Sequence, residues 1–384
     1  MAVTLLADDQ SVARRILDHI DHSTTDLSAS TWREPVEHYR SPGRLALELE
    51  RAFRHSPTPF CPSAALAEPG AYLAREAAGT PILAVRGRDG EVRAFRNACR
   101  HRGVQVAEGS GCGTAFVCRY HGWTYGLDGA LRHVPHAHGF PDLDPARHGL
   151  VPVRAVERHG LVFVTQDEPE LAEPCLDELA GVLPPELRLH SVTEEVFAAN
   201  WKILMDGFLE GYHLRATHRR TFYPIQFDNL NVIERFGRNS RVAFPYQRIG
   251  KLRSVPAAER SVDGMLTYVY HLFPNVVVAT FPLTRAVIVQ EPLGVDRTRV
   301  INYTLTALPE GDADAEAALK SALDFQREGA AEDRDVACSA QRALASGANE
   351  FYEFGRFEGA LTHFHRSLAE VVNGAAGAAR AASG

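Results

Sequence analysis

Two cysteines and two histidines form the first group of side chains whose types and spacing suit metal binding. They occur as Cys99-x-His101 and, after sixteen intervening residues, Cys118-x-x-His121. Two thiolates and two imidazoles on separate loops can bind one structural Zn²⁺ ion. They can also bind a [2Fe–2S] cluster with cysteine on one iron and histidine on the other, which raises the reduction potential above that of an all-cysteine cluster. The spacing alone leaves both cofactors open.

The second candidate metal site is the pattern Glu210-x-x-His213-x4-His218. Glu210 and His213 are three residues apart, so we expect them to share one helix face. His213 and His218 are about 140° apart on a regular helix, at about 100° per residue. Both can reach one metal only if the helix ends or distorts between them. Asp206, one helical turn before Glu210, is a candidate for lining a pocket or orienting a ligand histidine, and a solvated or capping role is the alternative.

The residues around both sites carry a family resemblance. His101 and His121 are each followed closely by glycine, in HRG and HGW, and these loops resemble those of Rieske proteins, in which glycines let backbone N–H groups approach the cluster sulfurs. Downstream, residues 200–218 read NWKxxxDxFxExYHxxxxH. Together the two motifs resemble Rieske non-heme iron oxygenase α subunits over residues 40–370.

This resemblance implies a Rieske cluster at the Cys/His pairs and a mononuclear Fe(II) bound by two histidines and one carboxylate, with positions open for O₂. His213 and His218 match the histidine ligands. Asp333 matches the carboxylate position, and Asp335 and Glu332 are the competing acidic residues. We therefore expect Asp333 to complete the iron site.

The resemblance also assigns a role to Glu210. In the family, an acidic residue three positions before the first iron-ligand histidine bridges the two metal centres. Here that residue is Glu210, and His121 matches the cluster histidine that it would contact in the neighbouring subunit. This implies electron transfer across the heterologous interface of a head-to-tail homotrimer. The Glu-x-Tyr-His form is more typical of enzymes built of α subunits alone, including quaternary-ammonium and aromatic-acid oxygenases and demethylases.

Other cysteines, histidines and aromatic residues have ordinary interpretations. We interpret Cys112 as a hairpin residue that binds nothing. Three further cysteines are interpreted as buried or inert: Cys61, Cys175 and Cys338. Three histidines are interpreted as polar loop residues: His133, His136 and His138. Five residues are candidates for the substrate cavity, although core packing explains such residues more often: Met205, Phe208, Leu209, Phe222 and Tyr223.

The elements that must position these side chains are short strands followed by helices. Asp-Gly pairs at 89–90 and 128–129 predict β-hairpins around the Cys/His loops. Residues 200–220, 312–346 and 349–372 have helical patterns, and four strands are predicted between 240 and 310. With the resemblance, this predicts an α+β fold in which a Rieske β domain is inserted in a helix-grip (START/SRPBCC-like) catalytic domain with an antiparallel sheet. The expected boundaries are 1–44 for a helical segment packing on the catalytic domain, 45–168 for the Rieske domain, 169–374 for the catalytic domain and 375–384 for a flexible tail.

Composition limits the possible partners. The chain has 384 residues, with 41 Lys and Arg against 48 Asp and Glu, a formal net charge of −7. Without a basic block, nucleic-acid binding is not expected. No signal peptide and no apolar stretch of membrane-spanning length are visible. Six cysteines are too few for a disulfide scaffold, so we expect a reducing cytoplasm.

The expected function is the terminal oxygenase component of a Rieske system. It would activate O₂ at Fe(II) with electrons from the cluster, and hydroxylate or oxidatively demethylate a small organic substrate, with aromatic compounds as the first expectation. Since no flavin or nucleotide motif is visible, a separate NAD(P)H-dependent reductase, with or without a ferredoxin, must supply the electrons. A quaternary-ammonium monooxygenase (betaine, carnitine or choline-like) is the alternative, and a zinc-structured protein without enzymatic activity is a remote one.

Overall fold

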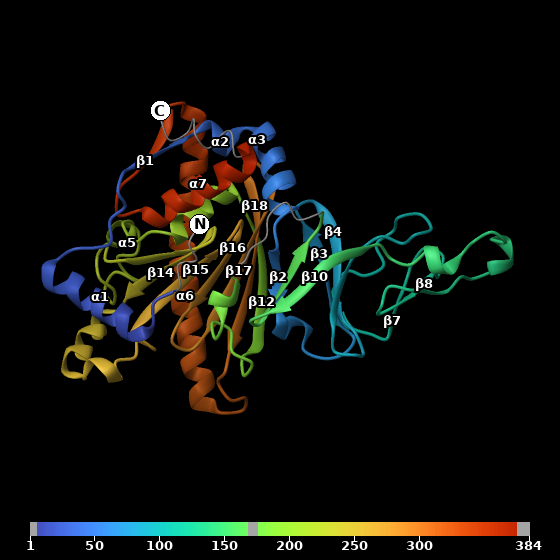
Figure 1. Ribbon diagram of the computed structural model, residues 1–384, viewed down its shortest axis with the longest axis horizontal. Helices are drawn as coiled ribbons and strands as arrows, with labels where there is room; N and C mark the ends of the chain where they lie inside the picture. The colour runs from blue at the N-terminus through green and yellow to red at the C-terminus, as the bar shows by residue number, and fades with distance from the viewer. Residues whose placement is uncertain (1–5, 168–175, 375–384) are drawn as a thin grey trace. The chain divides into compact units, whose positions relative to one another are not determined.

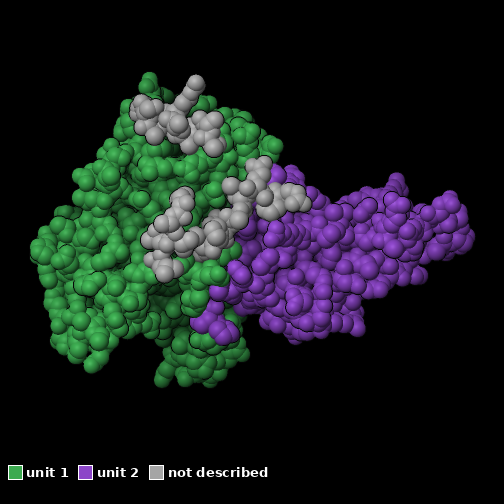
Figure 2. All heavy atoms as spheres, viewed as in Figure 1, with its two compact units in different colours: residues 1–53, 173–182, 186–384 green, residues 54–172, 183–185 purple. Residues whose placement is uncertain are grey.

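The computed structural model describes residues 6–167 and 176–374, and the chain forms two compact units (Figure 2). Unit 1 holds the described residues among 1–53, 173–182 and 186–384, and unit 2 holds those among 54–172 and 183–185. Unit 1 is thus interrupted in sequence by unit 2. The predicted tail at 375–384 and the predicted boundary at residue 168 lie outside the described residues.

The expected domain start at residue 45 differs from the structure, because unit 2 begins at Arg54. The chain near residue 45 is helical, with α3 at Pro42–Leu47 followed by further helical turns at Glu48–Phe53. The ring of Phe53 packs edge-on against the ring of Trp201, with 5.1 Å between centroids. This aromatic contact packs residues 48–53 on unit 1, so the boundary between the units lies after residue 53 rather than at residue 45.

Unit 2 is mainly β, as predicted. It contains an antiparallel sheet of strand order β2-β11-β10-β5-β4-β3-β6 and a smaller sheet of order β7-β8-β9. The strands are β2 Thr58–Pro62, β3 Ala71–Ala77, β4 Thr80–Arg86, β5 Val92–Arg96, β6 Gly109–Cys112, β7 Ala115–Val117, β8 Thr124–Gly126, β9 Leu131–His133, β10 Pro152–Arg158 and β11 Leu161–Thr165. The predicted Asp-Gly turns connect β4 to β5 and β8 to β9, and Gly90 and Gly129 adopt left-handed φ values of 84° and 79°.

The main sheet of unit 1 is antiparallel, with strand order β12-β18-β17-β16-β15-β14-β13. Its strands are β12 Arg188–Phe197, β13 Val232–Phe236, β14 Asn239–Pro245, β15 Leu266–Leu272, β16 Val276–Thr280, β17 Arg285–Gly294 and β18 Arg297–Thr306. The four strands predicted between 240 and 310 correspond to β15 to β18, and β14 is an additional strand in that region. The α+β class with antiparallel sheets is confirmed.

Helices cover both faces of this sheet (Figure 1). They are α1 Asp9–His22, α2 Glu37–Arg40, α3, α4 Trp201–Phe208, α5 Leu214–Thr217, α6 Ala313–Ala343 and α7 Gly359–Asn373. The apolar side of α1 packs against a cluster that includes Leu266, whereas Phe364 of α7 contacts His271. Because residues 266 and 271 point to opposite faces of β15, α1 and α7 lie on opposite faces of the sheet.

Two predicted helices differ from the structure. The one expected over 349–372 begins as a strand, β19 Phe351–Phe354, which pairs antiparallel with β1 Trp32–Pro35. The aromatic residues of β19 favour an extended backbone when a partner strand is present. The helix expected over 200–220 is interrupted between α4 and α5. None of the helices in the described part of the chain is long and apolar enough to cross a membrane.

Candidate metal centres

Three predicted ligands converge in unit 1. The Asp333 Oδ1 atom lies 3.0 Å from His218 Nε2 and 3.6 Å from His213 Nε2, and the potential ligand atoms of the three residues lie within 4.8 Å of one another. Ligands at right angles on one metal, with bonds of about 2.1 Å, are separated by about 3 Å. The arrangement therefore fits the two-histidine, one-carboxylate triad of non-heme iron enzymes, which leaves other positions open.

The interrupted helix explains how both histidines reach one point. His213 lies directly before α5 and His218 directly after it, so the single turn of α5 brings their rings to 5.1 Å between centroids. The expectation that Glu210 and His213 share a helix face is wrong, because both lie between α4 and α5. Gly211 permits the break by close approach to the sheet, since a Cβ there would lie 2.6 Å from Asn231 Oδ1.

Glu210 holds His213 from the side away from Asp333. Its Oε1 atom is in hydrogen-bond contact with His213 Nδ1, and its Oε2 atom accepts the backbone N–H of His213 at 3.1 Å. The proton on Nδ1 is thereby engaged and Nε2 is left to face Asp333. Burial lowers the pKa of His213, but the carboxylates of Glu210 and Asp333 outweigh burial and raise that pKa above its usual value.

Glu332 does for His218 what Glu210 does for His213. Its Oε2 atom lies 2.9 Å from His218 Nδ1 and accepts the hydroxyl proton of Thr221 at 2.6 Å. Burial lowers the pKa of His218, and the carboxylates of Asp333 and Glu332 outweigh that effect and raise it. Glu332, expected as a competing ligand, instead contacts Nδ1 of the candidate ligand His218. The contact between Glu332 and His218 spans 114 residues, so no local signal in the sequence indicates this role.

The long helix α6 carries both Asp333 and Glu332. The ring of Phe222 fits against Gly329 of α6, where a Cβ atom would lie 2.4 Å from Phe222 Cε2. The same ring meets His218 edge-on at 4.9 Å between centroids. The other competing acid, Asp335, has a side chain that is 80% exposed and is not among the converging ligands.

The recognised partners of the Asp206 carboxylate in the described part of the chain are Tyr39 and His365 rather than the two candidate ligand histidines. The carboxylate accepts the hydroxyl of Tyr39 at 2.8 Å and lies 2.8 Å from His365 Nε2. The expected pocket-lining or ligand-orienting role is therefore replaced by a buried polar network with α7. Of the proposed cavity residues, Met205 and Leu209 are fully buried, and Phe208 and Tyr223 are partly buried. The ring of Phe222 contacts the ring of His218, and the backbone N–H of Tyr223 donates to the His218 carbonyl at 3.0 Å.

The four cluster residues occupy two loops of identical design in unit 2. In each loop the cysteine carbonyl accepts the N–H of a glycine four residues later, Gly103 for Cys99 and Gly122 for Cys118, both at 2.9 Å. These glycines have φ values of 77° and 74°, a left-handed conformation that disfavours other residues. The glycine that follows each loop histidine is therefore required by the turn.

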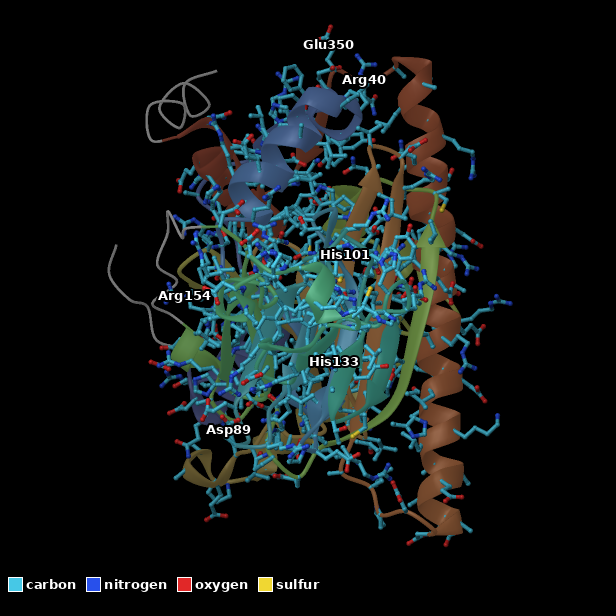
Figure 3. The ribbon with its side chains drawn as sticks, turned by 90° about the vertical axis from the view of Figure 1, so that its right-hand side faces the viewer. Arg40, Asp89, His101, His133, Arg154 and Glu350 are labelled. Carbon is cyan, nitrogen blue, oxygen red and sulfur yellow. The ribbon has the colours of Figure 1, made fainter. Side chains whose placement is uncertain are left out.

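The cysteines and histidines face different surroundings. Cys99 and Cys118 are 4% and 3% exposed and belong to the hydrophobic core of unit 2. His101 is partly exposed and His121 is exposed, with 4.6 Å between their ring centroids; Figure 3 labels His101. The hydroxyl of Tyr125 lies 3.2 Å from Cys99 Sγ. An inner iron on the cysteines and an outer iron on the histidines fits this division.

A single zinc ion fits these residues less well. In the part of the chain that the structure describes, the triad in unit 1 is the one group of three or more possible ligands that converges on one ion. Cys112 is exposed, Cys61 is buried and Cys338 is partly exposed, and Cys175 lies outside the described residues. Three further histidines are exposed: His133, His136 and His138. His133 is the last residue of strand β9, so the expectation that it lies in a loop is wrong.

Comparisons with known proteins agree with both centres. A family model for the "Rieske [2Fe-2S] domain" matches residues 56–148, and one for the "Ring hydroxylating alpha subunit (catalytic domain)" matches residues 176–374. The chain is 27% identical to the chloroplastic choline monooxygenase of Beta vulgaris over 366 residues, 89% of this chain and 76% of that protein. It is 33% identical over 210 residues to the carnitine monooxygenase oxygenase subunit of Acinetobacter pittii, and this alignment covers 51% of the chain and only 55% of the relative.

A solved structure has the same fold. The quaternary ammonium Rieske monooxygenase CntA, in complex with L-carnitine, has a TM-score of 0.74 at 23% identity, covering 96% of this chain and 100% of that one. The catalytic-domain match spans just over half of the 384 residues. The Rieske match lies before it in the chain, as the order of the Cys/His motif and the Glu/His motif predicts. The chain belongs to the ring-hydroxylating Rieske oxygenase α subunits.

Proposed function

We propose that this chain is the terminal oxygenase of a system that oxidises a small quaternary ammonium compound. The convergence of His213, His218 and Asp333 supports the oxygenase chemistry. The substrate class is supported by the relatives, since a choline and a carnitine monooxygenase are both similar to the chain. This is the alternative reading of the sequence, and aromatic compounds become the second candidate.

The side chains of the chain itself prepare the iron site. When bound by the triad, Fe(II) supplies the redox chemistry that O₂ activation needs. Glu210 and Glu332 each engage a histidine Nδ1 atom, which fixes the tautomer and leaves Nε2 as the metal-binding atom. Both histidines must lose a proton to bind metal, so iron binding weakens as pH falls.

Electrons must come from another protein. The carnitine relative is named an oxygenase subunit, which supports a separate NAD(P)H-dependent reductase, with or without a ferredoxin. We further propose that Cys99, His101, Cys118 and His121 hold the Rieske cluster, and that Glu210 links His213 to the partner's cluster in a homotrimer. A cytoplasmic location stays a prediction.

Aromatic substrates remain the second candidate because of the rings beside the triad. Phe222 lies next to His218 and packs edge-on against Phe325, with 5.2 Å between ring centroids. Such rings can stack on an aromatic substrate or attract a quaternary ammonium group by cation–π interaction. The distinction therefore needs a substrate assay.

A substrate panel tests the proposal. The iron-loaded protein, supplied with a reductase and NADH, is given choline, carnitine, glycine betaine, benzoate and naphthalene while O₂ uptake and products are measured. We expect uptake coupled to product with at least one of the three quaternary ammonium compounds. The Asp333→Ala variant is the control for iron-dependent turnover. Coupled uptake with the aromatic compounds alone would overturn the substrate assignment, and a colourless protein without a Rieske EPR signal would overturn the cluster assignment.

A further inference from the structure

Unit 1 contains a cavity of about 490 Å³ whose lining includes none of the three triad residues. Strands β14 to β17 form its floor, and its walls are formed by residues 6–9, 177–182 and 262–264. Tyr268 on the floor and His271, which contacts α7, lie on opposite faces of β15. The cavity is therefore on the face of the sheet that α1 covers, away from α7.

The floor of the cavity holds a row of polar side chains across three strands. Tyr268 of β15 is the antiparallel partner of Thr280 of β16, and Thr280 is the partner of Arg285 of β17. Residues directly opposite each other lie on the same face of a sheet. The phenol of Tyr268 and the guanidinium of Arg285 therefore face the same space. The Thr280 hydroxyl is already engaged, because it accepts the backbone N–H of Tyr268 at 3.2 Å.

Two buried donors of this row have no hydrogen-bond partner among the described residues. They are the Nε–H group of Arg285 and the hydroxyl of Tyr268. The guanidinium is anchored elsewhere, since Nη1 of Arg285 donates to the carbonyls of Phe281 at 2.7 Å and Thr284 at 3.2 Å. Buried donors in native proteins are nearly always paired. Both donors are thus placed to serve one acceptor group that enters the cavity.

Arg285 also carries a positive charge that forms no ion pair within the described ranges. Burial lowers the pKa of its guanidinium, yet an arginine stays protonated at neutral pH. The carboxylate of Asp263 favours that charge only from beyond ion-pair distance. Arg241, by contrast, pairs with Glu234 through Nε at 2.9 Å and lies over the Tyr268 ring, 4.4 Å from its centroid. Arg285 is therefore the cation available to an anionic group.

The walls of the cavity carry the opposite charge. Four acidic residues line it: Asp9, Asp177, Glu178 and Asp263. Asp177 and Asp263 are exposed, whereas the two donor atoms on the floor are buried. Negative charge thus lies toward solvent and positive charge lies at the floor. This distribution repels a simple anion at the entrance and suits a molecule with charges of both signs.

We propose that this cavity binds a small zwitterion, a molecule with one carboxylate and one ammonium group. The ligand carboxylate accepts from Arg285 Nε and from the Tyr268 hydroxyl, and the ammonium group faces the carboxylates of the walls. A carboxylate has two acceptor oxygens, which match the two donors. The volume is within the range of small-molecule sites, about 300–1,000 Å³. Amino acids and betaines share this chemistry.

The site goes beyond the proposed oxygenase function, because the triad takes no part in it. It is a second binding site, and its existence does not depend on which compound is oxidised. If no compound in the substrate panel supports turnover, the substrate proposal fails, whereas a binding measurement still decides whether the zwitterion site exists.

Calorimetric titration of the full-length protein, loaded with cluster and iron, tests the proposal. L-Proline and glycine betaine are the zwitterionic probes, one from each class. Acetate lacks the cation, and tetramethylammonium lacks the carboxylate. Every titration is repeated on Asp333→Ala, because glycine betaine is also a candidate substrate. We expect saturable binding of at least one zwitterion to both proteins, and binding at least about tenfold weaker for the two singly charged probes.

Two variants of the floor locate the binding. Arg285→Gln removes the charge and the Nε–H group, and Tyr268→Phe removes the hydroxyl alone. Each should weaken zwitterion binding by at least about tenfold, the usual effect of losing a hydrogen bond to a charged group. Arg297→Gln is the matched control, because Arg297 is exposed on β18 and does not line the cavity. It should bind as wild type does.

Thermal unfolding without ligand separates a ligand-binding role from a structural one. The Tyr268 hydroxyl has no partner, so Tyr268→Phe should unfold at the same temperature as wild type or at a higher one. It should also lose the rise in unfolding temperature that the zwitterion gives wild type. A lower unfolding temperature would show that the hydroxyl stabilises the fold, against the proposal.

Three binding results would overturn the zwitterion site. The first is the absence of saturable binding of both zwitterions, as expected of a cavity that holds only water. The second is acetate binding as tightly as the zwitterions, which indicates a site for simple anions. The third is zwitterion binding that is lost in Asp333→Ala and retained in Arg285→Gln and Tyr268→Phe, which places the ligand at the triad.

Discussion

At the residue scale, a carboxylate contacts Nδ1 of each histidine of the proposed triad and leaves Nε2 as the atom that would bind the metal. Glu210 engages Nδ1 of His213, and Glu332 engages Nδ1 of His218 with Thr221 as a second donor to the same oxygen. Partners of this kind orient ligand histidines and raise their basicity. The two glutamates therefore have parallel roles toward the metal, although only Glu210 belongs to the sequence motif.

Glu332→Gln should weaken iron binding while leaving the triad in place. The amide cannot accept from His218 and Thr221 as a carboxylate does, and loss of such a partner typically costs about 10–100-fold in metal affinity. Competition with a chelator gives the iron dissociation constant. Glu328→Gln, one helical turn earlier and 53% exposed, is the matched control, and equal affinities in the two variants would contradict the role of Glu332.

Glu210→Gln should separate metal binding from turnover. We expect the variant to keep its cluster and most of its mononuclear iron, because the three ligands are unchanged, but to turn over at least about tenfold more slowly since the bridging carboxylate is lost. Iron content, the Rieske EPR signal and coupled O₂ uptake are measured on one preparation. Near-normal uptake would rule out the bridge.

The candidate ligand residues could be proposed from the sequence because their pattern is local. Cys99 and His101, or His213 and His218, are separated by a few residues, so spacing and flanking glycines identify them. The contacts of Glu332 and His365 span 114 and 159 residues. No local pattern encodes such pairs, and only the packing of α6 and α7 reveals them.

At the element scale, the interruption between α4 and α5 and the close packing of α6 together bring the three candidate iron ligands to one point. The sequence predicts one helix over 200–220, because its apolar residues follow a helical period. The interruption depends on Gly211 approaching Asn231, the residue before β13, which the period does not encode. The prediction of a helix over 349–372 is wrong at its start for a similar reason, because β19 forms by pairing with the distant strand β1.

Replacing one glycine by alanine should change the free energy of unfolding in opposite directions in α6 and in α4. Gly329→Ala places a Cβ against the Phe222 ring, which itself meets His218. Overpacking costs about 1–3 kcal/mol, and the better helix propensity of alanine offsets about 0.5–1 kcal/mol of it. We expect a net loss of about 1 kcal/mol and weaker iron binding.

The control for this change is Gly207→Ala in α4, where a Cβ would have no neighbour within 4 Å. That variant should gain about 0.4–1 kcal/mol by restricting the unfolded chain. Denaturant unfolding and iron titration measure both variants. Equal changes in the free energy of unfolding would show that the Phe222 ring moves aside without an energetic cost. That result would contradict tight packing between Gly329 and Phe222.

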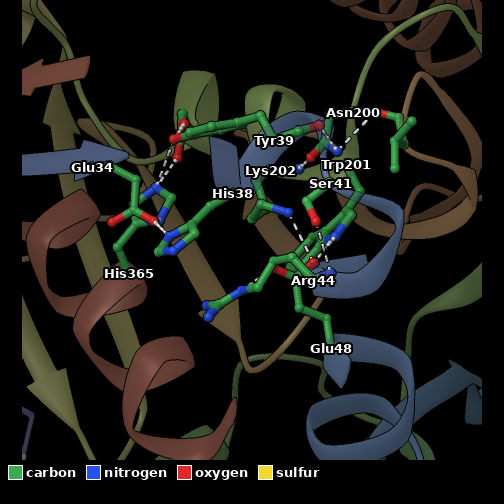
Figure 4. Close-up of polar contacts among 12 residues, drawn as sticks. Glu34, His38, Tyr39, Ser41, Arg44, Glu48, Asn200, Trp201, Lys202 and His365 are labelled. Carbon is green, nitrogen blue, oxygen red and sulfur yellow. Dashed lines mark hydrogen bonds and ion pairs between the residues drawn. The ribbon is translucent and has the colours of Figure 1, made fainter. Parts of the chain in front are cut away.

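At the scale of the whole molecule, His365 of α7 joins Glu34 of β1 and Asp206 of α4 within unit 1 (Figure 4). Its electrostatics give stability a pH dependence. The pKa of His365 rises from 6.5 to about 9 on folding, so the folded chain holds a proton that the unfolded chain releases. The stabilisation is fully present below about pH 6.5 and is lost as pH rises through 9.

The wild-type protein should therefore lose more stability than His365→Gln between pH 6.5 and 9. A shift of this size corresponds to a pH-dependent contribution on the order of 3 kcal/mol. Free energies of unfolding of both metal-free proteins, measured at several pH values, give the difference directly. Parallel pH profiles would show that His365 does not carry the proton in the folded state.

The order of domains was predictable, and their boundary was less so. Cysteine and histidine motifs in a strand-rich segment, followed by a helical motif, indicate the Rieske domain before the catalytic one. The helical turns of residues 48–53 pack on unit 1 through Phe53 and Trp201, which shifts the start of unit 2 to Arg54. A contact between residues so far apart is invisible in the sequence.

The central claim, that Asp333 completes a mononuclear iron site separate from the cluster, is tested most directly by counting iron in Asp333→Ala. Wild-type protein should hold two cluster irons and one mononuclear iron per chain. The variant should hold only the two cluster irons, with an unchanged Rieske spectrum, while Asp335→Ala, whose side chain is 80% exposed, should retain all three. Full iron content in Asp333→Ala would contradict the account.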